Sequence, residues 1–386
     1  MYIQKPKVIV ILGIMGAIPV AGVAWQVLHY LLGFRRLGYD VHYVEATGIW
    51  PYGASSDDCT FPVEYIGKTM KAFGLDGKWA YCAAHSDGRC YGLSEGAITS
   101  LYERADAIIN LTGATVLSDQ QKVCKKLIYL ETDPVIPQVN IALEDQFTRE
   151  FLSAHSLHFT FGENLGKVDC LVPVQLFDYK TTRPPIVLEL WEGGSRIKGE
   201  KLTTIANWKQ VGKDIVYLGE IYYWSKHREF LKVIELPRLT KEKIELALAI
   251  DDPEGEQLLN AHGWLIENAL KKSEDLFTYR EYIWHSKGEF TVAKDQNVRL
   301  KSGWFSDRSA CYLASGKPVI TQETGFSKFL PIGEGLFAFQ TLDDILQALD
   351  CIESNYERHS RAAKEIAEEY FHSDKVLKEF AQTAGL

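Results

Sequence analysis

The sequence predicts an α/β fold in which two doubly wound domains, each a mostly parallel sheet covered by helices, face one cleft. Three observations predict it. The chain has 386 residues, which is long for one domain and suits two. Short apolar strands alternate with helical segments along the first half, and a second series of the same kind begins after residues 177–185. Such alternation is typical of parallel sheets with helices on both faces.

The first half shows the pattern most clearly. Residues 7–12 form an unbroken apolar run, as expected of a strand that is buried on both faces. Residues 22–37 follow with helical periodicity and end at Gly38, a suitable helix C-terminus. Further strands are predicted at residues 41–44, 107–111, 127–130 and 157–161. The loops after these strands should carry the function, because ligands bind at the carboxyl ends of the strands in such sheets.

The boundary between the domains is placed in the stretch FDYKTTRPP, residues 177–185, whose charges, threonines and paired prolines are typical of a linker. Strands are then predicted at residues 186–190, 214–218, 263–266, 290–292 and 318–321. Helices are predicted at residues 241–248, 279–285, 342–351 and 360–381. We therefore expect Rossmann-like domains at residues 1–178 and 179–365, and a C-terminal helix within 366–386 that can cross back to the first domain.

Composition and charge exclude several classes of protein. Hydrophobic residues make up 46% of the chain and charged residues 24%, as in an ordinary globular protein. The net charge of −9 disfavours a nucleic-acid partner, because phosphate backbones require a basic face. Residues 8–25 carry no charge, but their glycines and Pro19 fit a strand–loop–helix unit better than a membrane helix. The seven scattered cysteines favour reduced thiols and a cytoplasmic location, with CAAHSDGRC as a loop.

The most informative stretch is residues 302–325, which suits a phosphate-bearing donor. Gly303 lets the backbone come close to a ligand, and Ser306 or Asp307 can cap the start of a helix. A helix start offers free N–H groups, and Arg308 adds a cation that can hold two phosphate oxygens. The next strand, PVIT, should deliver three polar side chains to the cleft: Gln322, Glu323 and Thr324. The alternative is an ordinary helix–strand crossover with a capped start.

This stretch resembles the donor-binding segment of GT-B glycosyltransferases. The run ASGKPVITQETGF looks like their helix, Gly-x-Pro and strand, and SGWFSDRSACYLASGKPV is similar to a bacterial subgroup. The resemblance implies two Rossmann-like domains and a nucleotide diphosphate sugar as donor. Two departures stand out. The glutamate pair common in retaining members is replaced by Gly303 and Cys311, and the histidine that opens the segment in many inverting members is replaced by Ser302.

The resemblance implies further donor contacts. YLGEIYYWSKHREF is similar to the strand and lysine that hold the donor diphosphate, which places Lys226 on that lysine and Arg228 as a second cation. HSKGEF places Glu289 where it could accept hydrogen bonds from sugar or ribose hydroxyls. Trp264 would stack on the nucleobase, and Gly16 would lie close to the donor phosphates. A solvated basic turn, a surface carboxylate and a core tryptophan are the plainer interpretations.

The general base is sought among carboxylates that follow strands of the first half. These are Glu45, Glu131 with Asp133, and Glu163. A carboxylate in a partly dry cleft can deprotonate an acceptor hydroxyl. Asp133 is the first choice and Glu131 the second, because the loop after their strand faces the cleft in this architecture. An ordinary Asp-Pro turn is the alternative.

These observations together predict a hexosyltransferase-like enzyme. It would move a sugar from a nucleotide diphosphate sugar to a small-molecule or glycan acceptor, with no metal and no further cofactor. A nucleotide-sugar epimerase or hydrolase on the same fold, and a non-catalytic sugar-binding protein, remain as alternatives. A dehydrogenase that uses NAD is disfavoured, because the glycines after the first strand do not form the GxGxxG fingerprint.

Overall fold

The first domain is built around strand β1 (Val8–Leu12), which lies inside a sheet of order β4-β3-β2-β1-β5-β6-β7-β8. The structure is a computed structural model and describes residues 5–51 and 58–386. The remaining strands are β2 (Asp40–Glu45), β3 (Trp79–Cys82), β4 (Cys90–Gly92), β5 (Ala107–Leu111), β6 (Leu127–Glu131), β7 (Leu157–Thr160) and β8 (Tyr179–Thr181). Neighbouring strands run parallel, apart from the antiparallel pair β3 and β4 among the described residues.

Helices cover both faces of this sheet. They are α1 (Ala21–Arg36), α2 (Thr60–Ala72), α3 (Glu95–Arg104), α4 (Ile136–Ala142) and α5 (Gln146–Ser153). Alternate residues of β1 point to opposite faces: Ile9 and Ile11 join one apolar cluster, whereas Val10 and Leu12 join another. Burial on both faces explains why the strand is an unbroken apolar run, so the predicted βα start is confirmed.

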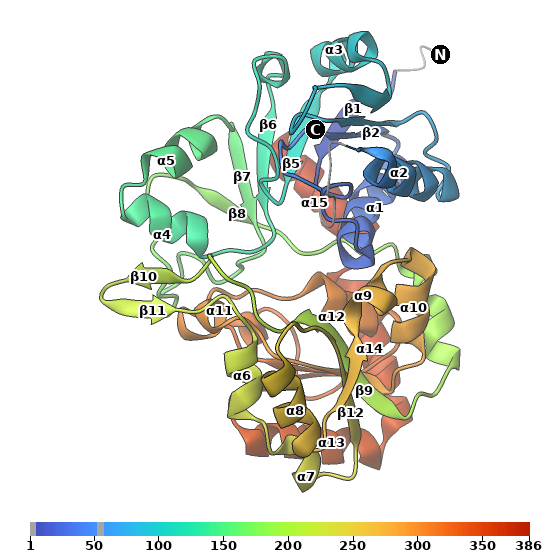
Figure 1. Ribbon diagram of the computed structural model, residues 1–386, viewed down its shortest axis with the longest axis vertical. Coiled ribbons are helices and arrows are strands. Elements are labelled where there is room, and N and C mark those ends of the chain that lie inside the picture. The colour runs from blue at the N-terminus through green and yellow to red at the C-terminus, as the bar shows by residue number, and fades with distance from the viewer. Residues whose placement is uncertain (1–4, 52–57) are drawn as a thin grey trace.

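The second domain holds a parallel sheet of order β13-β12-β9-β14-β15-β16 and lies below the first in Figure 1. Its strands are β9 (Lys201–Asn207), β12 (Lys243–Ala249), β13 (Leu265–Asn268), β14 (Gly288–Thr291), β15 (Val319–Gln322) and β16 (Leu336–Phe339). Its helices are α6 (His227–Lys232), α7 (Leu236–Leu239), α8 (Pro253–Ala261), α9 (Ala269–Ser273), α10 (Leu276–Trp284), α11 (Asp295–Arg299), α12 (Asp307–Ala314), α13 (Leu342–Ser354) and α14 (Tyr356–Tyr370). The prediction of two doubly wound α/β domains is confirmed.

Two elements of the second domain differ from the prediction. Residues 241–248 were predicted as a helix, but β12 occupies this stretch and pairs with β9 on one side and β13 on the other. The run KIELALA is rich in helix formers, and pairing on both edges outweighs that local preference. The first strand of the sheet is β9 rather than residues 186–190, which form a short 3-10 turn at Leu188–Leu190.

A hairpin of β10 (Ile215–Tyr217) and β11 (Glu220–Tyr222) takes the place of the strand predicted at residues 214–218. The hairpin lies outside the parallel sheet. Its side chains Ile215, Tyr217 and Tyr222 pack with Val135 and Val139 of the first domain. The hairpin therefore forms an apolar contact between the domains.

The C-terminal segment returns to the first domain. Residues 360–381 were predicted as one helix, but the chain breaks between α14 and α15 (Ser373–Ala384), where the His372 side chain accepts a hydrogen bond from the N–H of Asp374. Helix α15 packs against α1 in the upper domain of Figure 1. A Cβ atom on Gly33 of α1 would lie 2.4 Å from Leu377, so glycine permits this close approach. Strand β8 pairs with β7, so the first sheet extends past residue 178.

The cysteine prediction is wrong at one pair. Cys82 and Cys90 form a disulfide, and they lie opposite each other in the β3–β4 hairpin. The stretch CAAHSDGRC is therefore two short strands joined by a loop. Scattered spacing gave no hint of this bond, because the register of the hairpin brings the two residues together. No described helix has both the length and the apolar character needed to cross a membrane.

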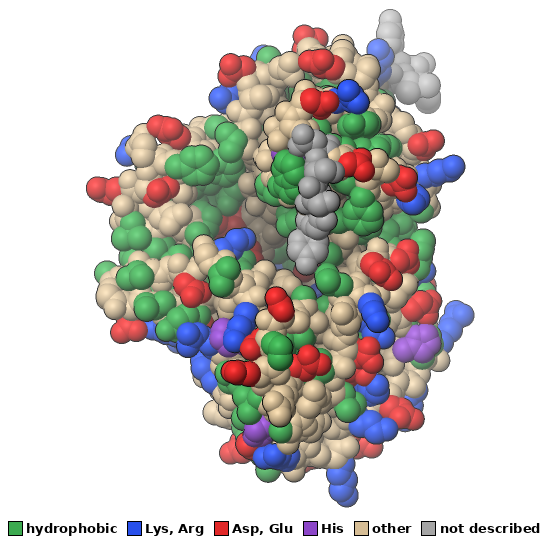
Figure 2. All heavy atoms as spheres, in the orientation of Figure 1, with side chains coloured by type: hydrophobic (Ala, Val, Ile, Leu, Met, Phe, Trp, Pro, Cys, Tyr) green, Lys and Arg blue, Asp and Glu red, His purple; other side chains and the backbone are tan. Residues whose placement is uncertain are grey.

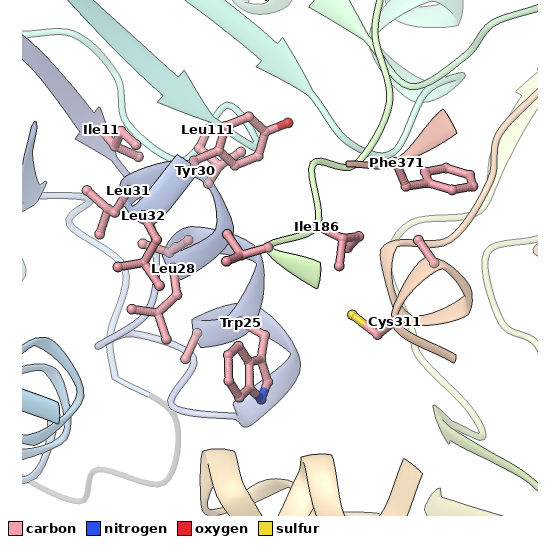
Figure 3. Packing of buried hydrophobic residues seen from close by; sticks show 14 of the residues in the cluster. Ile11, Trp25, Leu28, Tyr30, Leu31, Leu32, Leu111, Ile186, Cys311 and Phe371 are labelled. Atoms are coloured by element: carbon pink, nitrogen blue, oxygen red, sulfur yellow. The ribbon is translucent and has the colours of Figure 1, made fainter. Parts of the chain in front are cut away.

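The domains share an apolar core along one edge. Figure 3 shows Trp25 of α1, Ile186 directly after the linker, Phe371 and Cys311 of α12 around this junction. The segment after the linker is fixed to α1 because the Val187 N–H donates to Nδ1 of His29 at 3.1 Å. Burial lowers the pKa of His29 to about 3, so the imidazole stays neutral and accepts this bond.

The core contact of α15 supports a prediction. The Phe380 ring stacks on Phe159 at a centroid distance of 4.1 Å and meets Phe34 edge-on at 5.9 Å. Phe380→Ala should lower the free energy of unfolding by about 3–5 kcal/mol, measured by urea denaturation. Lys378→Ala, at an exposed position of the same helix, is the control and should change the midpoint little. Equal losses in the two variants would contradict this packing.

Candidate functional site

The carboxyl ends of strands from both sheets meet at the cleft between the domains. The face shown in Figure 2 is hollowed where the two domains approach each other. Two polar contacts cross here: Lys294 pairs with Asp133, and the Trp304 indole donates to the Thr132 carbonyl at 2.9 Å. Lys294 follows β14 of the second sheet, and Asp133 follows β6 of the first. The cleft is therefore lined by the loops that the sequence indicates.

Arg308 lies in the first turn of α12 and is held by three partners. Its Nε donates to Glu289 at 2.6 Å, one Nη donates to the Ile205 carbonyl at 2.7 Å, and the other donates to Thr291 Oγ1 at 2.9 Å. Burial disfavours the charge, but the Glu289 carboxylate outweighs it and raises the pKa of Arg308. The structure thus fixes a permanent cation beside the start of α12, where the first backbone N–H groups have no partner within the helix backbone.

Glu289 does not line the cleft surface as the sequence suggested. Its side chain is fully buried between β9 and β15, where it can form no direct hydrogen bond with a ribose or sugar. One carboxylate oxygen accepts from Arg308, and the other has no hydrogen-bond partner among the described residues. The physical reason is its place inside a central strand. Glu289 therefore acts on the cleft only by holding Arg308.

Lys226 and Lys294 add two cations to the same neighbourhood. Burial, together with the charges of Arg308 and Lys294, lowers the pKa of Lys226 to about 7. Burial also lowers the pKa of Lys294 to about 8, against the opposing effect of Asp133. The Lys294 Nζ lies 3.1 Å from the centre of the Trp224 ring. We call Lys226, Lys294 and Arg308 the cation cluster. Such a cluster suits a ligand with adjacent negative charges.

Two predicted donor contacts lie apart from the cation cluster. Trp264 is 1% exposed, and its indole donates to the Ile234 carbonyl at 2.8 Å, so it belongs to the core and cannot stack on a base. Burial within an apolar cluster beside β13 explains this correction. Arg228 is exposed, and its guanidinium lies 3.8 Å from the centre of the Tyr223 ring. Among the described residues, no hydrogen bond or ion pair joins Arg228 to the cation cluster.

The wall formed by residues 302–325 is held by its own polar groups. Gly303 has φ +78, and a Cβ there would lie 2.4 Å from the Asn164 backbone nitrogen, so the first domain packs directly on this glycine. Ser302 bonds to Asn297, Gln322 to Glu229, and Thr324 to the Trp304 carbonyl. Glu323 accepts from the N–H of Gly325 and is half-buried. These side chains shape the wall, and Glu323 is the one among Ser302, Gln322, Glu323 and Thr324 that is not buried.

The start of α12 faces the first domain. Ser306 occupies the position before the helix without a side-chain cap bond. Asp307 accepts from the Arg308 N–H at 2.9 Å and from Gln26 of α1 at 3.3 Å. Burial raises the pKa of Asp307. Asp307 thus links the helix start to α1, as well as lying beside the cluster.

The two candidate bases occupy different surroundings. Glu131 is 2% exposed and accepts from Gln138 at 2.9 Å and Thr160 at 2.6 Å, and burial raises its pKa to about 8. Its oxygens are thus engaged inside the first sheet. Asp133 has a side chain that is 31% exposed and lies at the cleft against Lys294. The geometry favours Asp133 over Glu131 as the residue that can meet a substrate.

The glycine loop after β1 is held by Glu45, a role that the sequence did not reveal. The buried Glu45 carboxylate accepts from the N–H groups of Gly16 at 2.7 Å and Ala17 at 2.6 Å, and from the Tyr43 hydroxyl at 2.5 Å. Burial raises the pKa of Glu45 to about 7. A Cβ on Gly16 would lie 2.8 Å from the Ile66 side chain, so the loop packs closely against α2 at this glycine.

Sequence reasoning also missed Lys294, Trp224 and Trp304. Lys294 follows a predicted strand, and that position was the available signal. Its pairing with Asp133 joins residues that are 161 positions apart, which a single sequence does not show. Within residues 5–51 and 58–386, no group of three or more His, Cys, Asp or Glu side chains is arranged to hold a metal ion.

Comparison with protein-family models and with curated proteins gives no match. Comparison with solved structures gives matches along the whole chain. HepE of Anabaena is similar in two structures, one in complex with UDP-glucose and one in complex with UDP and glucose. The UDP-glucose complex has a TM-score of 0.58 and 11% identity, with coverage of 98% of this chain and 99% of that chain.

Two further structures are similar over the same extent. A glycosyltransferase from Rickettsia africae has a TM-score of 0.57 and 10% identity, with coverage of 99% of this chain and 98% of that one. Sucrose-phosphate synthase from Thermosynechococcus elongatus has a TM-score of 0.54 and 11% identity, with coverage of 98% of both chains. At such identities the likeness concerns the fold. The chain has the GT-B fold of these glycosyltransferases.

Proposed function

We propose that the protein is a glycosyltransferase that uses a nucleotide diphosphate sugar. The observation that carries the proposal is the cation cluster at the start of α12, which faces the carboxylate of Asp133 across the cleft. Three cations and the positive end of a helix match the charge of a diphosphate, and Asp133 supplies an acid–base group opposite them. The structural likeness to HepE in complex with UDP-glucose supports UDP as a first nucleotide to test.

In the proposed reaction, the bond between the sugar carbon and the diphosphate oxygen breaks, and its electron pair stays on the diphosphate. Arg308, Lys226 and the start of α12 stabilise the negative charge that develops there. The acceptor hydroxyl oxygen forms the new bond to the sugar carbon, and its proton passes to the Asp133 carboxylate. Protein cations alone can stabilise this leaving group, so we propose a metal-independent transfer of a hexose to a small-molecule or glycan acceptor.

The first test is binding. The purified chain is incubated with UDP, GDP, ADP, TDP and the matching sugar nucleotides, and its thermal unfolding is followed. A ligand at a hundredfold excess over its Kd should stabilise the folded state by about 2.7 kcal/mol. We expect a clear rise in Tm with at least one nucleotide. If none of the nucleotides raises the Tm, the donor proposal is wrong.

The cation cluster should determine donor affinity. Lys226→Ala removes a shielded charge next to the diphosphate, and Arg308→Gln removes the fixed cation. Each should weaken nucleoside diphosphate binding by at least about tenfold in calorimetry, as expected for losing a close charge pair. Lys271→Ala, an exposed lysine of the second domain, is the control and should bind normally. Unchanged affinity in both cluster variants would mean that the diphosphate binds elsewhere.

The pH dependence of donor binding should follow Lys226. Its pKa in the free protein is about 7, so the amine is charged below that pH and neutral above it. The charged and titratable groups that act on it are Arg308, Lys294, Glu289 and Asp133. Affinity for UDP-glucose should therefore fall as the pH rises, by roughly tenfold between pH 7 and pH 8.5. UDP-glucose is the proper ligand, because its diphosphate does not titrate in this range.

Lys226→Arg is the matched variant for that measurement. Arginine remains charged throughout this range, so the dependence of affinity on pH above pH 7 should become much weaker. Any remaining loss of affinity for UDP-glucose should begin nearer pH 8, where Lys294 loses its charge. The same pH profile in the wild type and in Lys226→Arg would show that Lys226 does not titrate against the donor.

A further inference from the structure

Lys294 and Asp133 form an ion pair across the cleft. The Lys294 ammonium is paired with one Asp133 oxygen, and this is its one hydrogen bond among the described residues. Lys294 is 8% exposed, so few water molecules can replace that partner. The other Asp133 oxygen is buried and has no hydrogen-bond partner within the described residues. Both groups that the proposed reaction needs are therefore engaged with each other in this structure.

The three cations of the cluster are held to different degrees. Arg308 is fixed by Glu289, the Ile205 carbonyl and Thr291, so it cannot turn toward a ligand without leaving a buried carboxylate unpaired. Lys294 has a flexible stem and a single partner on the opposite domain. Lys294 is therefore the cation that can exchange partners when an anion arrives.

We propose that Lys294 couples donor binding to the release of Asp133. This inference rests on the proposed function. The diphosphate carries more negative charge than the carboxylate, and it binds where Arg308 is already held in place and Lys226 lies nearby. Lys294 then leaves Asp133 for the diphosphate, and the Asp133 carboxylate loses its counter-ion. The freed carboxylate accepts a hydrogen bond from the acceptor hydroxyl and takes its proton. Lys294 is thus a positioning residue for the general base.

The coupling has a consequence for the order of events. While Lys294 is paired, Asp133 has no oxygen open to an acceptor hydroxyl. The carboxylate becomes available when the donor diphosphate occupies the cation cluster. The protein therefore binds the donor before it activates the acceptor, and the energy for separating the ion pair comes from the diphosphate contacts.

A double-mutant cycle on binding tests this inference without an acceptor. The four proteins are the wild type, Asp133→Asn, Lys294→Met and the double variant. The ligand is UDP, or GDP, ADP or TDP if the nucleotide panel selects one of them, and the Kd is measured by calorimetry. Asp133→Asn should tighten binding by about tenfold in the wild-type background, because Lys294 no longer has to leave a carboxylate. In the Lys294→Met background the same substitution should change Kd by less than about threefold.

The cycle separates the proposal from simpler explanations. Equal tightening in both backgrounds would mean that Asp133 only repels the phosphates, and weaker binding in Asp133→Asn would mean that Asp133 itself supports the ligand. Either result overturns the coupling. Asp169→Asn is the control, because it removes a different lysine–aspartate pair between the domains, that of Asp169 with Lys328. If loosening of the domain contact alone changed binding, this variant would show it; we expect its Kd to be unchanged. If the wild type binds none of the four nucleotides, the donor proposal fails and the coupling fails with it.

Discussion

The ion pair between Glu289 and Arg308 is the interaction on which the geometry of the cleft depends. Glu289 is fully buried in β14, and breaking a buried pair by losing one partner costs about 3–5 kcal/mol. Arg308 therefore cannot rotate freely, and the first turn of α12 keeps one position relative to the sheet. The guanidinium is thus held in place before any ligand arrives, and such preorganisation is the condition for strong electrostatic stabilisation.

Buried carboxylates perform the same task on the opposite wall. Glu45 holds the backbone of the glycine loop, and Glu131 joins the end of β6 to Thr160 at the end of β7 and to Gln138 of α4. The carboxylate oxygens of both side chains accept hydrogen bonds from groups of the first domain. Asp133 differs because its side chain is partly exposed and its ion-pair partner among the described residues comes from the other domain. A structural carboxylate here is one whose oxygens already accept hydrogen bonds within its own domain, and Asp133 is not of that kind.

The sequence predicts the parts of this arrangement that are local. Continuous apolar runs identify β1 and β5, and the Gly303 to Arg308 pattern identifies the wall beside α12, because a glycine and a cation lie close together in the sequence there. Non-local effects are missed. The residues of β12 favour a helix, but strand pairing on both edges outweighs that preference. Glu289 is buried by neighbours that are distant in sequence. Cys82 and Cys90 meet through hairpin register, and Lys294 meets Asp133 through the docking of two domains.

The contacts between the domains differ in kind from one edge to the other. Along one edge, α1, the segment after the linker, α12 and α15 share a continuous apolar core that contains Trp25 and Phe371. At the cleft, polar contacts such as Lys294 with Asp133 and Trp304 with Thr132 join the domains beside the apolar contact of the β10–β11 hairpin. Separating apolar surface costs free energy in proportion to its area, whereas a buried polar group that loses its partner needs another partner in its place. A ligand that enters the cleft therefore meets polar groups that are already paired, and it must replace the partner of any group that it takes.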